Sequence, residues 1–298
     1  MIDKLEMFMT VAKEGHFGHA AQSLGITQPT LSAGIKQLEE QLGVMLIFRN
    51  SRYGGLTPEG KRTLEWARRI VSDSRQLREE MRAMHHGLSG RLRIAAIPTA
   101  MTWAAKLITR FGEKHPNVDF TVLSSTSIEI LQMIDDLEVD AGLTYLNNEP
   151  VGKVSTISLY DEQFMLVCRE DHPLTEHERL DWKQLAGERL CLLTTDMQNR
   201  RIINRNLADA GITARAMIES NSTVSMIAHV LESNCVTLLP EDIATFLGEG
   251  KKLRLIRMNG PRPGHSVGLV APYREPQTPV LAELMAEGAR MARDRLLL

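Results

Sequence analysis

Apolar positions in the first 90 residues recur at the spacing of α-helices. Leu5, Phe8 and Ala12 share one face of a predicted N-terminal helix, because residues three or four apart lie on the same side of a helix. Residues 87–90, rich in Gly and Ser, end the helical pattern and predict a linker. The elements predicted between them are helices over residues 18–24 and 28–42, a small β-hairpin over 46–56, and a long helix from 58 to about 84.

After residue 90 the pattern changes to short apolar runs that alternate with helical segments such as residues 102–114 and 128–137. The predicted strands cover residues 91–97, 118–123, 139–145, 164–169, 190–193, 214–219, 236–239, 253–258 and 266–271. This alternation predicts an α/β domain with mostly parallel sheets. A domain of roughly 200 residues with this many strands favours two lobes over one.

One segment, HFGHAAQSLGITQPTLSAGIKQLEEQL over residues 16–42, predicts a helix-turn-helix. Gly25 can take the left-handed backbone of a tight turn, and Thr27 is placed to cap the helix that follows. That helix carries an apolar stripe formed by Leu31, Ile35, Leu38 and Leu42. Its other face presents Gln28, Thr30, Ser32, Lys36 and Gln37. A helix of this size fits the major groove of DNA, and the alternative is an ordinary helical hairpin with a solvated face.

Further motifs continue along the chain in a fixed order. They are F-x-x-A-A-x-x-L-x-I-T-Q-P-T-L-S at 17–32, K-Q-L-E-E-Q-L-G-V at 36–44, L-T-P-E-G at 56–60, H-P-N at 115–117, V-D-A-G at 139–142 and D-H-P-L at 171–174. With these motifs the whole chain resembles the LysR-type transcriptional regulators. It departs from the family pattern at His16, where Ser is common, at Met45, Ile47 and Phe48, and at Gly54-Gly55 in the hairpin.

The resemblance implies an α/β protein with three parts. An all-α winged helix-turn-helix DNA-binding domain is expected over residues 1–58, and a dimerising linker helix and hinge over 59–89. A two-lobed effector-binding domain resembling periplasmic binding proteins is expected over 90–298. Its first lobe would take about residues 90–160 and 268–298, and its second lobe about 161–267.

The resemblance also implies which residues meet DNA. Gln28, Pro29 and Ser32 would contact bases or nearby phosphates, because Gln pairs with adenine and Pro contacts a thymine methyl group. The supporting contacts to the backbone and the minor groove would come from Thr27, Thr30, Lys36 and Arg52. Two alternatives stay open: Thr27 serves only as a helix cap, and Arg52 is only a solvated hairpin tip.

The long helix has a heptad pattern of its own. Thr63, Ile70, Leu77 and Met84 lie seven apart, and Ala67, Ser74, Met81 and Leu88 follow each by four. We call these eight residues the seam. They predict a dimer through Ile70, Leu77, Met81 and Met84, although the stripe could instead pack on its own DNA-binding domain.

In the effector domain, the family resemblance places a small ligand between the lobes. Hydroxyl side chains stand at two helix N-termini, where free N–H groups attract anions. The first-lobe candidates are Thr99, Ala100, Met101, Ser125, Thr126 and Ser127, with Thr99 and Ser127 the strongest, although Ser127 could be an ordinary cap. The second-lobe candidates are Thr194, Thr195, Asn221 and Thr223, and Arg200 and Arg201 could balance an anion or lie on a solvated face.

Composition limits the remaining possibilities. The chain has 298 residues and a net charge of −2, and its first 90 residues carry 12 basic and 10 acidic side chains. Charge alone therefore does not predict DNA binding. Three widely spaced cysteines fit a reducing compartment, so we expect a cytoplasmic protein. No cysteine pair or histidine cluster has metal-ligand spacing, so we expect neither a metal nor a cofactor. Cys168 is expected to be buried packing and not a redox switch.

The function predicted from these features is ligand-responsive, sequence-specific regulation of transcription. The expected partners are an operator in double-stranded DNA, a small organic or inorganic anion as effector, further copies in a homodimer or homotetramer, and RNA polymerase during activation, with no membrane. The alternative is an architectural DNA-binding protein without effector response, which does not explain the second domain. We expect no enzyme, because the sequence has no Gly-rich phosphate loop, G-x-S-x-G or H-E-x-x-H motif.

Overall fold

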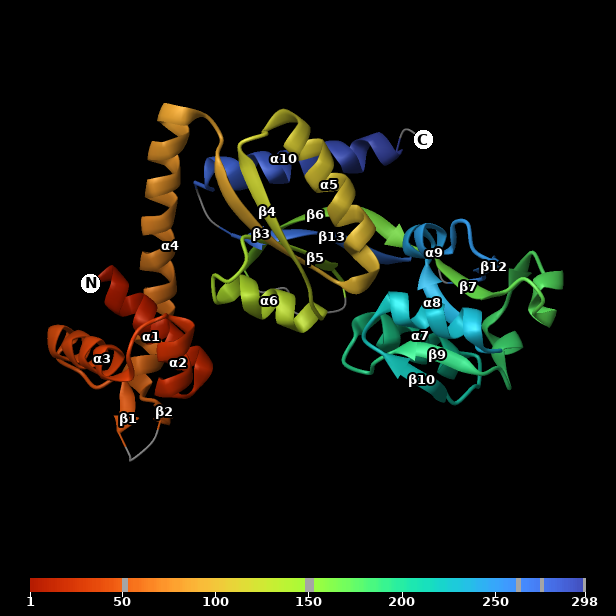
Figure 1. The fold of residues 1–298 in the computed structure, drawn as a ribbon, viewed down its shortest axis with the longest axis horizontal. Helices are drawn as coiled ribbons and strands as arrows, with labels where there is room; N and C mark the ends of the chain where they lie inside the picture. The colour runs from red at the N-terminus through yellow and green to blue at the C-terminus, as the bar shows by residue number, and fades with distance from the viewer. Residues whose placement is uncertain (50–52, 148–152, 261–263, 274–275, 297–298) are drawn as a thin grey trace. The chain divides into compact units, whose positions relative to one another are not determined.

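The computed structural model describes residues 1–49, 53–147, 153–260, 264–273 and 276–296 and contains two compact units (Figure 1). The first unit runs from Met1 to Leu88, and the second takes up most of the remaining chain. In the described residues, no helix has the length and apolar character needed to cross a membrane.

The first unit has the helices and the hairpin predicted from the sequence. Its elements are α1 (Ile2–Glu14), α2 (Phe17–Ser23), α3 (Gln28–Leu42), β1 (Ile47–Arg49), β2 (Tyr53–Leu56) and α4 (Pro58–His86). Phe8, Leu31, Leu38 and Leu46 are fully buried and form a core that joins α1, α3 and the hairpin. The helices form here because each one buries its apolar stripe against the other two.

The second unit has two sheet systems, which we call the first and second lobes. The first lobe consists of β3 (Gly90–Ala96), α5 (Met101–Lys114), β4 (Val118–Ser124), α6 (Ser127–Asp135), β5 (Ala141–Tyr145), β6 (Val154–Glu162), β13 (His265–Pro272) and α10 (Pro279–Leu296). Its sheet has the order β4-β3-β5-β13-β6. Helix α6 covers one face, where a Cβ on Gly142 would meet Ile130 at 2.3 Å, and α10 packs near Leu269 through Gly288.

The second lobe consists of β7 (Phe164–Arg169), β8 (Arg179–Leu180), β9 (Leu190–Leu193), α7 (Gln198–Asp209), β10 (Ala216–Ser220), α8 (Thr223–Glu232), β11 (Thr237–Pro240), α9 (Glu241–Gly248) and β12 (Leu253–Met258). Its strands have the orders β11-β7-β12-β8 and β10-β9. The chain crosses from the first lobe to the second at Gln163, between β6 and β7, and returns after β12. The lobe limits expected from the family resemblance stay a prediction.

The expectation of mostly parallel sheets is wrong, because the sheets are mixed. Strand β13 is antiparallel to both β5 and β6, and β7 is antiparallel to both β11 and β12. These strands lie next to the two crossings, where the chain enters one lobe and leaves the other. The sequence analysis did not predict β6, because polar residues interrupt its apolar ones and it lacks the continuous apolar run of the buried strands.

Candidate functional site

Helix α3 presents the predicted DNA-contacting residues on its exposed side. It begins at Gln28, where the hydroxyl of Thr27 accepts a hydrogen bond from the backbone N–H of Thr30 at 3.4 Å. Thr27, Gln28, Pro29, Thr30, Ser32 and Lys36 are all exposed. Leu31, Ile35 and Leu38 are buried as predicted, but Leu42 is 41% exposed, because the helix ends there beside the groove described below.

Two features of the neighbouring segments position α3. His16 takes the capping role expected of Ser, since its Nδ1 accepts hydrogen bonds from the N–H groups of Gly18 at 3.0 Å and His19 at 3.3 Å. Gly25 has φ of +66°, the left-handed conformation that the turn between α2 and α3 requires. The helix-turn-helix is therefore held by local backbone bonds as well as by its core.

The hairpin is joined to α3 by a residue that the sequence analysis missed. Glu39 lies on α3, is buried, and accepts hydrogen bonds from the N–H groups of Leu46 at 2.9 Å and Ile47 at 3.4 Å. Its signal in the sequence is a carboxylate directly after the stripe residue Leu38. The predicted wing residue Arg52 lies outside the described residues.

Gly60 shows why the L-T-P-E-G motif ends in glycine. A Cβ on Gly60 would lie 2.0 Å from the carbonyl oxygen of Leu46, so no larger residue fits without moving the backbone. Thr57 caps α4 by accepting a hydrogen bond from the Gly60 N–H at 2.8 Å, and it donates to the Met45 carbonyl at 2.6 Å. The start of α4 is thus fixed to the residues that precede β1.

The seam on α4 is exposed over most of its length. Ile70 is 39%, Leu77 58%, Met81 43% and Met84 76% exposed. Ala67 differs, because it is fully buried in the core of its own domain, where α1 packs on α4. The four residues predicted for dimerisation therefore remain available to a partner.

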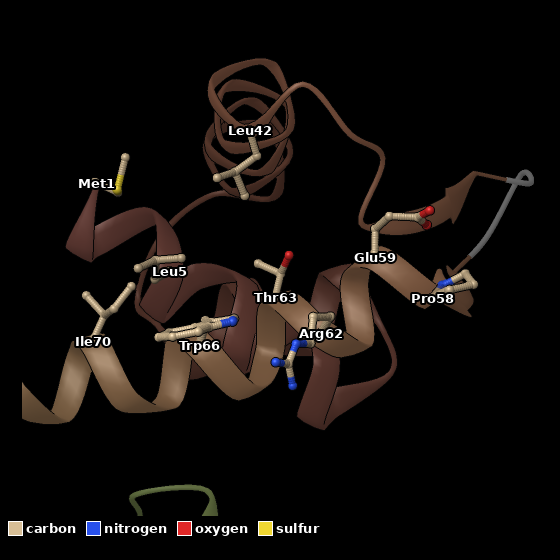
Figure 2. Close-up of a pocket in the computed structure, with 10 residues that line it drawn as sticks. Met1, Leu5, Leu42, Pro58, Glu59, Arg62, Thr63, Trp66 and Ile70 are labelled. Atoms are coloured by element: carbon tan, nitrogen blue, oxygen red, sulfur yellow. The ribbon is translucent and has the colours of Figure 1, made fainter.

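An apolar groove continues from the seam towards α1 and α3 (Figure 2). Its volume is about 610 Å³. The residues that line it are Met1, Leu5, Leu42, Pro58, Glu59, Arg62, Thr63, Trp66, Ala67 and Ile70. Trp66 is 48% exposed and gives the groove most of its aromatic surface. An exposed apolar surface of this kind marks a site for association.

In the first lobe, the two strongest predicted effector residues lie at the carboxyl ends of neighbouring strands, since Thr99 follows β3 and Ser127 follows β4. Thr144, which the sequence analysis missed, lies near the end of β5. The three are at most 1% exposed, and their hydroxyl oxygens make no hydrogen bond to any described residue. Strands β3, β4 and β5 are parallel, so their carboxyl ends meet at one edge.

At the start of α6, the structure distinguishes the residue that caps the helix from the residue that stays a ligand candidate. Thr126 is the cap, because it accepts a hydrogen bond from the Glu129 N–H at 3.2 Å while Glu129 accepts one from the Thr126 N–H at 2.9 Å. The alternative that Ser127 is an ordinary cap is therefore wrong. Ser125 contacts the sulfur of Met133 at 3.7 Å.

The two other first-lobe candidates lie at the start of α5. Ala100 is fully buried and directly precedes the helix, and Met101 is its first residue and is partly buried. Neither side chain offers a hydrogen bond, so any contact that they make with a ligand would be apolar.

In the second lobe, the predicted residues also follow parallel strands. Thr194 and Thr195 follow β9, and Asn221 and Thr223 follow β10. The hydroxyl oxygen of Thr194 is buried and unpartnered among the described residues, and Thr223 is 8% exposed. Thr195 and Asn221 are exposed.

Arg200 does not lie on a solvated face. It is 4% exposed and donates to the Leu193 carbonyl at 2.7 Å and to Glu219 at 2.8 Å. These bonds fix α7 to the ends of β9 and β10. Arg200 therefore has a structural role, and its charge already has a partner.

Three further residues lie close together near the boundary between the lobes, and the sequence analysis missed them. Glu162, the last residue of β6, accepts a hydrogen bond from the Tyr145 hydroxyl at 2.6 Å, and both are buried. Burial raises the pKa of Glu162 to about 8, although the nearby hydroxyls of Tyr145 and Thr99 lower it. Burial, and then the charge of Glu162, raise the pKa of Tyr145, whereas Asn199 on α7 lowers it.

Asn199 completes this set from the second lobe. It is 3% exposed, and neither its side-chain oxygen nor its nitrogen has a hydrogen-bond partner within the described part of the chain. We call Thr99, Ser127, Thr144, Tyr145, Glu162, Thr194 and Asn199 the polar cluster. Buried polar atoms are nearly always hydrogen-bonded by protein, water or ligand, so the polar cluster is a candidate for contact with an effector.

A second contact between the lobes lies on helices α5 and α9. The indole N–H of Trp103 donates to Asp242 at 3.0 Å, and Lys106 pairs with the same carboxylate at 3.4 Å. Trp103 stacks on Tyr160 with ring centroids 4.6 Å apart. The contact through Asp242 therefore joins the two lobes.

The cysteines are all buried. Burial raises the pKa of Cys168 and of Cys191 to about 11 in each case. Because the thiolate is the reactive form, these two thiols are poor nucleophiles at neutral pH.

Comparisons with known proteins match both units. The family model "LysR substrate binding domain" matches residues 85–292, and the model "Bacterial regulatory helix-turn-helix protein, lysR family" matches residues 2–61. The HTH-type transcriptional regulator YbhD of Escherichia coli is 32% identical over 70% of this chain and 66% of its own length. The DNA-binding transcriptional dual regulator OxyR of E. coli is 28% identical over 98% of this chain and 96% of its own.

A solved structure shares the fold of the whole chain. A full-length variant of OxyR from Pseudomonas aeruginosa matches with a TM-score of 0.73 and 24% identity, over 98% of this chain and 94% of that one.

Proposed function

The chain belongs to the LysR family of transcriptional regulators, with a DNA-binding helix-turn-helix domain and an effector-binding domain, and from this premise we propose how it acts. Copies of the chain associate through α4 and bind an operator through α3. A small effector binds at the polar cluster between the lobes and changes how the assembly engages DNA.

The DNA contact is proposed for the exposed face of α3. Gln28, Pro29 and Ser32 in its first turns reach base edges, while Thr27, Thr30 and Lys36 contact the backbone. Support comes from their common exposure on a helix whose other side is buried. Thr27 is a cap in the structure, and this does not prevent its exposed methyl and hydroxyl groups from contacting phosphate. Arg52 stays a predicted minor-groove contact.

Association is proposed along the seam. Ile70, Leu77, Met81 and Met84 would pack against the same helix of a second copy, and the groove beside Trp66 would receive part of it. A homodimer matches an operator with two half-sites, and two dimers would form a homotetramer.

The effector response is carried by one observation, the set of buried polar atoms without partners at the strand ends of both lobes. A ligand that satisfies atoms from both lobes favours the arrangement in which the lobes hold it. We place the protein in the cytoplasm, with RNA polymerase as a partner during activation and no catalytic activity.

Two other functions fit the residues less well. An architectural DNA-binding protein would have no need of a second unit that buries unpartnered polar groups. Peroxide sensing, suggested by the similarity to a hydrogen peroxide-inducible genes activator of E. coli, needs a reactive thiolate. The raised pKa values of Cys168 and Cys191 disfavour one.

The test begins with operators selected from a random duplex library by the full-length protein. A reporter carrying a selected operator is then screened with a panel of carboxylates, amides and polyols. The Thr99→Val/Ser127→Ala double variant should keep operator binding and lose the response, since each hydroxyl bond contributes on the order of 1–3 kcal/mol. Thr237→Val is the matched control, because this hydroxyl is also buried and unpartnered among the described residues but lies at the start of β11.

Two results would refute the proposal. An unchanged response in the double variant would remove the polar cluster as the effector site. Equal affinity for selected and random DNA would favour the architectural function.

A further inference from the structure

Glu162 is the one acidic side chain of the polar cluster. It is 3% exposed, its Oε2 accepts the Tyr145 hydrogen bond, and its Oε1 has no partner in the described chain. The titratable groups that act on it are Tyr145 from β5, Tyr160 from β6 and Asp242 from α9. None of these three groups carries a positive charge. The residue opposite Glu162 on β13 is His265, whose pKa is lowered by burial and then by the charge of Arg205. The cations beside the other groups are Lys106, which pairs with Asp242 at 3.4 Å, and Arg295, which lies 5.4 Å from the centroid of the Tyr160 ring.

The rest of the cluster is uncharged. Its unpartnered atoms, within the described residues, are the hydroxyl oxygens of Thr99, Ser127, Thr144 and Thr194 and the amide of Asn199. Arg200, which follows Asn199 on α7, is already paired with Glu219. An anion placed here would lose its hydration, and none of the groups that act directly on Glu162 would offer it a positive charge, which makes its burial costly.

We propose that Glu162 determines the specificity of the effector site, and that the effector is an uncharged molecule whose amide or hydroxyl group hydrogen-bonds to Glu162 Oε1. The inference rests on the proposed function of the polar cluster. It departs from the anion expected from the sequence, because that expectation considered helix N-termini without the buried carboxyl group beside them. Amides and hydroxyls both donate and accept hydrogen bonds, so they also match the unpartnered hydroxyls and the amide of Asn199.

Matched amide and carboxylate pairs test this on the full-length protein. The pairs are acetamide and acetate, benzamide and benzoate, and nicotinamide and nicotinate. Calorimetry gives the affinities, and the ¹³C signal of the Glu162 carboxyl, assigned by its loss in Glu162→Gln, gives the location. At pH 7 at least one amide should move that signal and bind at least about tenfold more tightly than its acid.

The pH dependence supplies a second readout. Glu162 ionises with a pKa of about 8. Above this pH, an acid that binds must bring a proton to Glu162, so the preference for the amide should grow by about tenfold per pH unit. Glu162→Gln should lose this pH dependence, because glutamine does not ionise.

Three outcomes would overturn the inference: an acid that binds as tightly as its amide at pH 7, a preference that does not change with pH in the parent, or no amide that moves the Glu162 signal. The Thr99→Val/Ser127→Ala variant shows whether only the inferred ligand class is wrong or whether the polar cluster is not the effector site at all. If acids bind better and the double variant weakens them, the polar cluster is the effector site and only the ligand class is wrong. If the double variant changes neither ligand binding nor the reporter response, the proposed function fails as well.

Discussion

The DNA-binding face and the polar cluster place their polar side chains in opposite environments. On α3, Gln28, Ser32 and Lys36 are exposed and cost the fold little, because water satisfies them. In the effector domain, Thr99, Ser127 and Asn199 are buried, and no described protein group hydrogen-bonds to their side chains. In the proposed function, a macromolecular partner therefore meets an exposed polar surface, whereas a small ligand meets polar groups inside the protein.

Leu77→Asp should produce the largest effect, because it places a charge in the apolar seam through which we propose that two copies associate. Every copy in a symmetric dimer would bring a carboxylate into the seam, and we expect dimerisation to weaken by about a hundredfold or more, with operator binding lost in parallel. Leu77 is 58% exposed, so the monomer should fold normally. Sedimentation measures the assembly, and Arg82→Asp, exposed on the same helix, is the control. An unchanged oligomer would remove the seam assignment.

Glu287→Gln tests the opposite kind of buried polar group, one that is fully partnered. Its carboxylate has no exposed surface and pairs with Arg110 at 3.0 Å, Lys114 at 2.6 Å and Arg290 at 2.7 Å. The expected loss of unfolding free energy is about 2–3 kcal/mol, below the value for fully buried pairs because the cations stay partly exposed.

The pH dependence of the Glu287 contribution checks the same prediction. The hydrogen bonds of Lys114 and Arg290 hold the pKa of Glu287 at about 2, below its ordinary 4.5, although burial opposes them. A depressed pKa stabilises the fold above pH 4.5, and the contribution disappears as the pH falls from about 4.5 to 2. Chemical denaturation at pH 7 and pH 3 should show the difference between parent and variant shrinking. A constant difference would contradict the assignment.

Gln28→Ala should act on the exposed face alone. We expect a loss of about 1–3 kcal/mol in binding a selected operator, with random-DNA binding nearly unchanged, because glutamine reads a base edge and not the charged backbone. Gln37→Ala is the control, since Gln37 is the same residue type, also exposed, and half a rotation further round α3. Competition gel shifts at fixed salt give both affinities. Equal losses on both DNAs would show that Gln28 does not read sequence.

Thr99→Val alone should have the smallest effect on stability. Its hydroxyl has no partner to lose within the described structure, so the unfolding free energy should change by less than about 0.5 kcal/mol or increase. Denaturant titration of Thr99→Val and Glu287→Gln under the same conditions compares their losses of unfolding free energy directly. A loss above about 1 kcal/mol would mean that Thr99 is a structural group and that the comparison fails at this residue.

The helices and the DNA-binding face could be predicted because each depends on residues close together in sequence. Leu31, Ile35 and Leu38 define the buried side of α3, and that periodicity assigns Lys36 to the other side. Gln28 is exposed because it is the first residue of the helix. Thr99 and Ser127 could also be predicted, since each lies in a short segment between a predicted strand and the N-terminus of the next predicted helix.

Glu162, Tyr145 and Asn199 could not be found in this way. They come from β6, β5 and α7, and only the topology of the mixed sheets brings them together. One local signal existed: Asp161, Glu162 and Gln163 interrupt two apolar runs, which marks the crossing between the lobes. Because β6 was not predicted, this signal could not be assigned to the end of a strand.

The close approach of Gly60 to Leu46 has a mechanical consequence. Because the base of α4 is packed against the residues before β1 and hydrogen-bonded to them through Thr57, we expect the hairpin and α4 to move as one lever. At 1.5 Å per residue, the 29 residues of α4 span about 43 Å. A tilt of about 10° along that length displaces one end by roughly 7 Å, or about two base-pair steps along DNA. In the proposed function, such a tilt at the far end of α4 would change the register on the operator without any rearrangement inside the domain that contacts it.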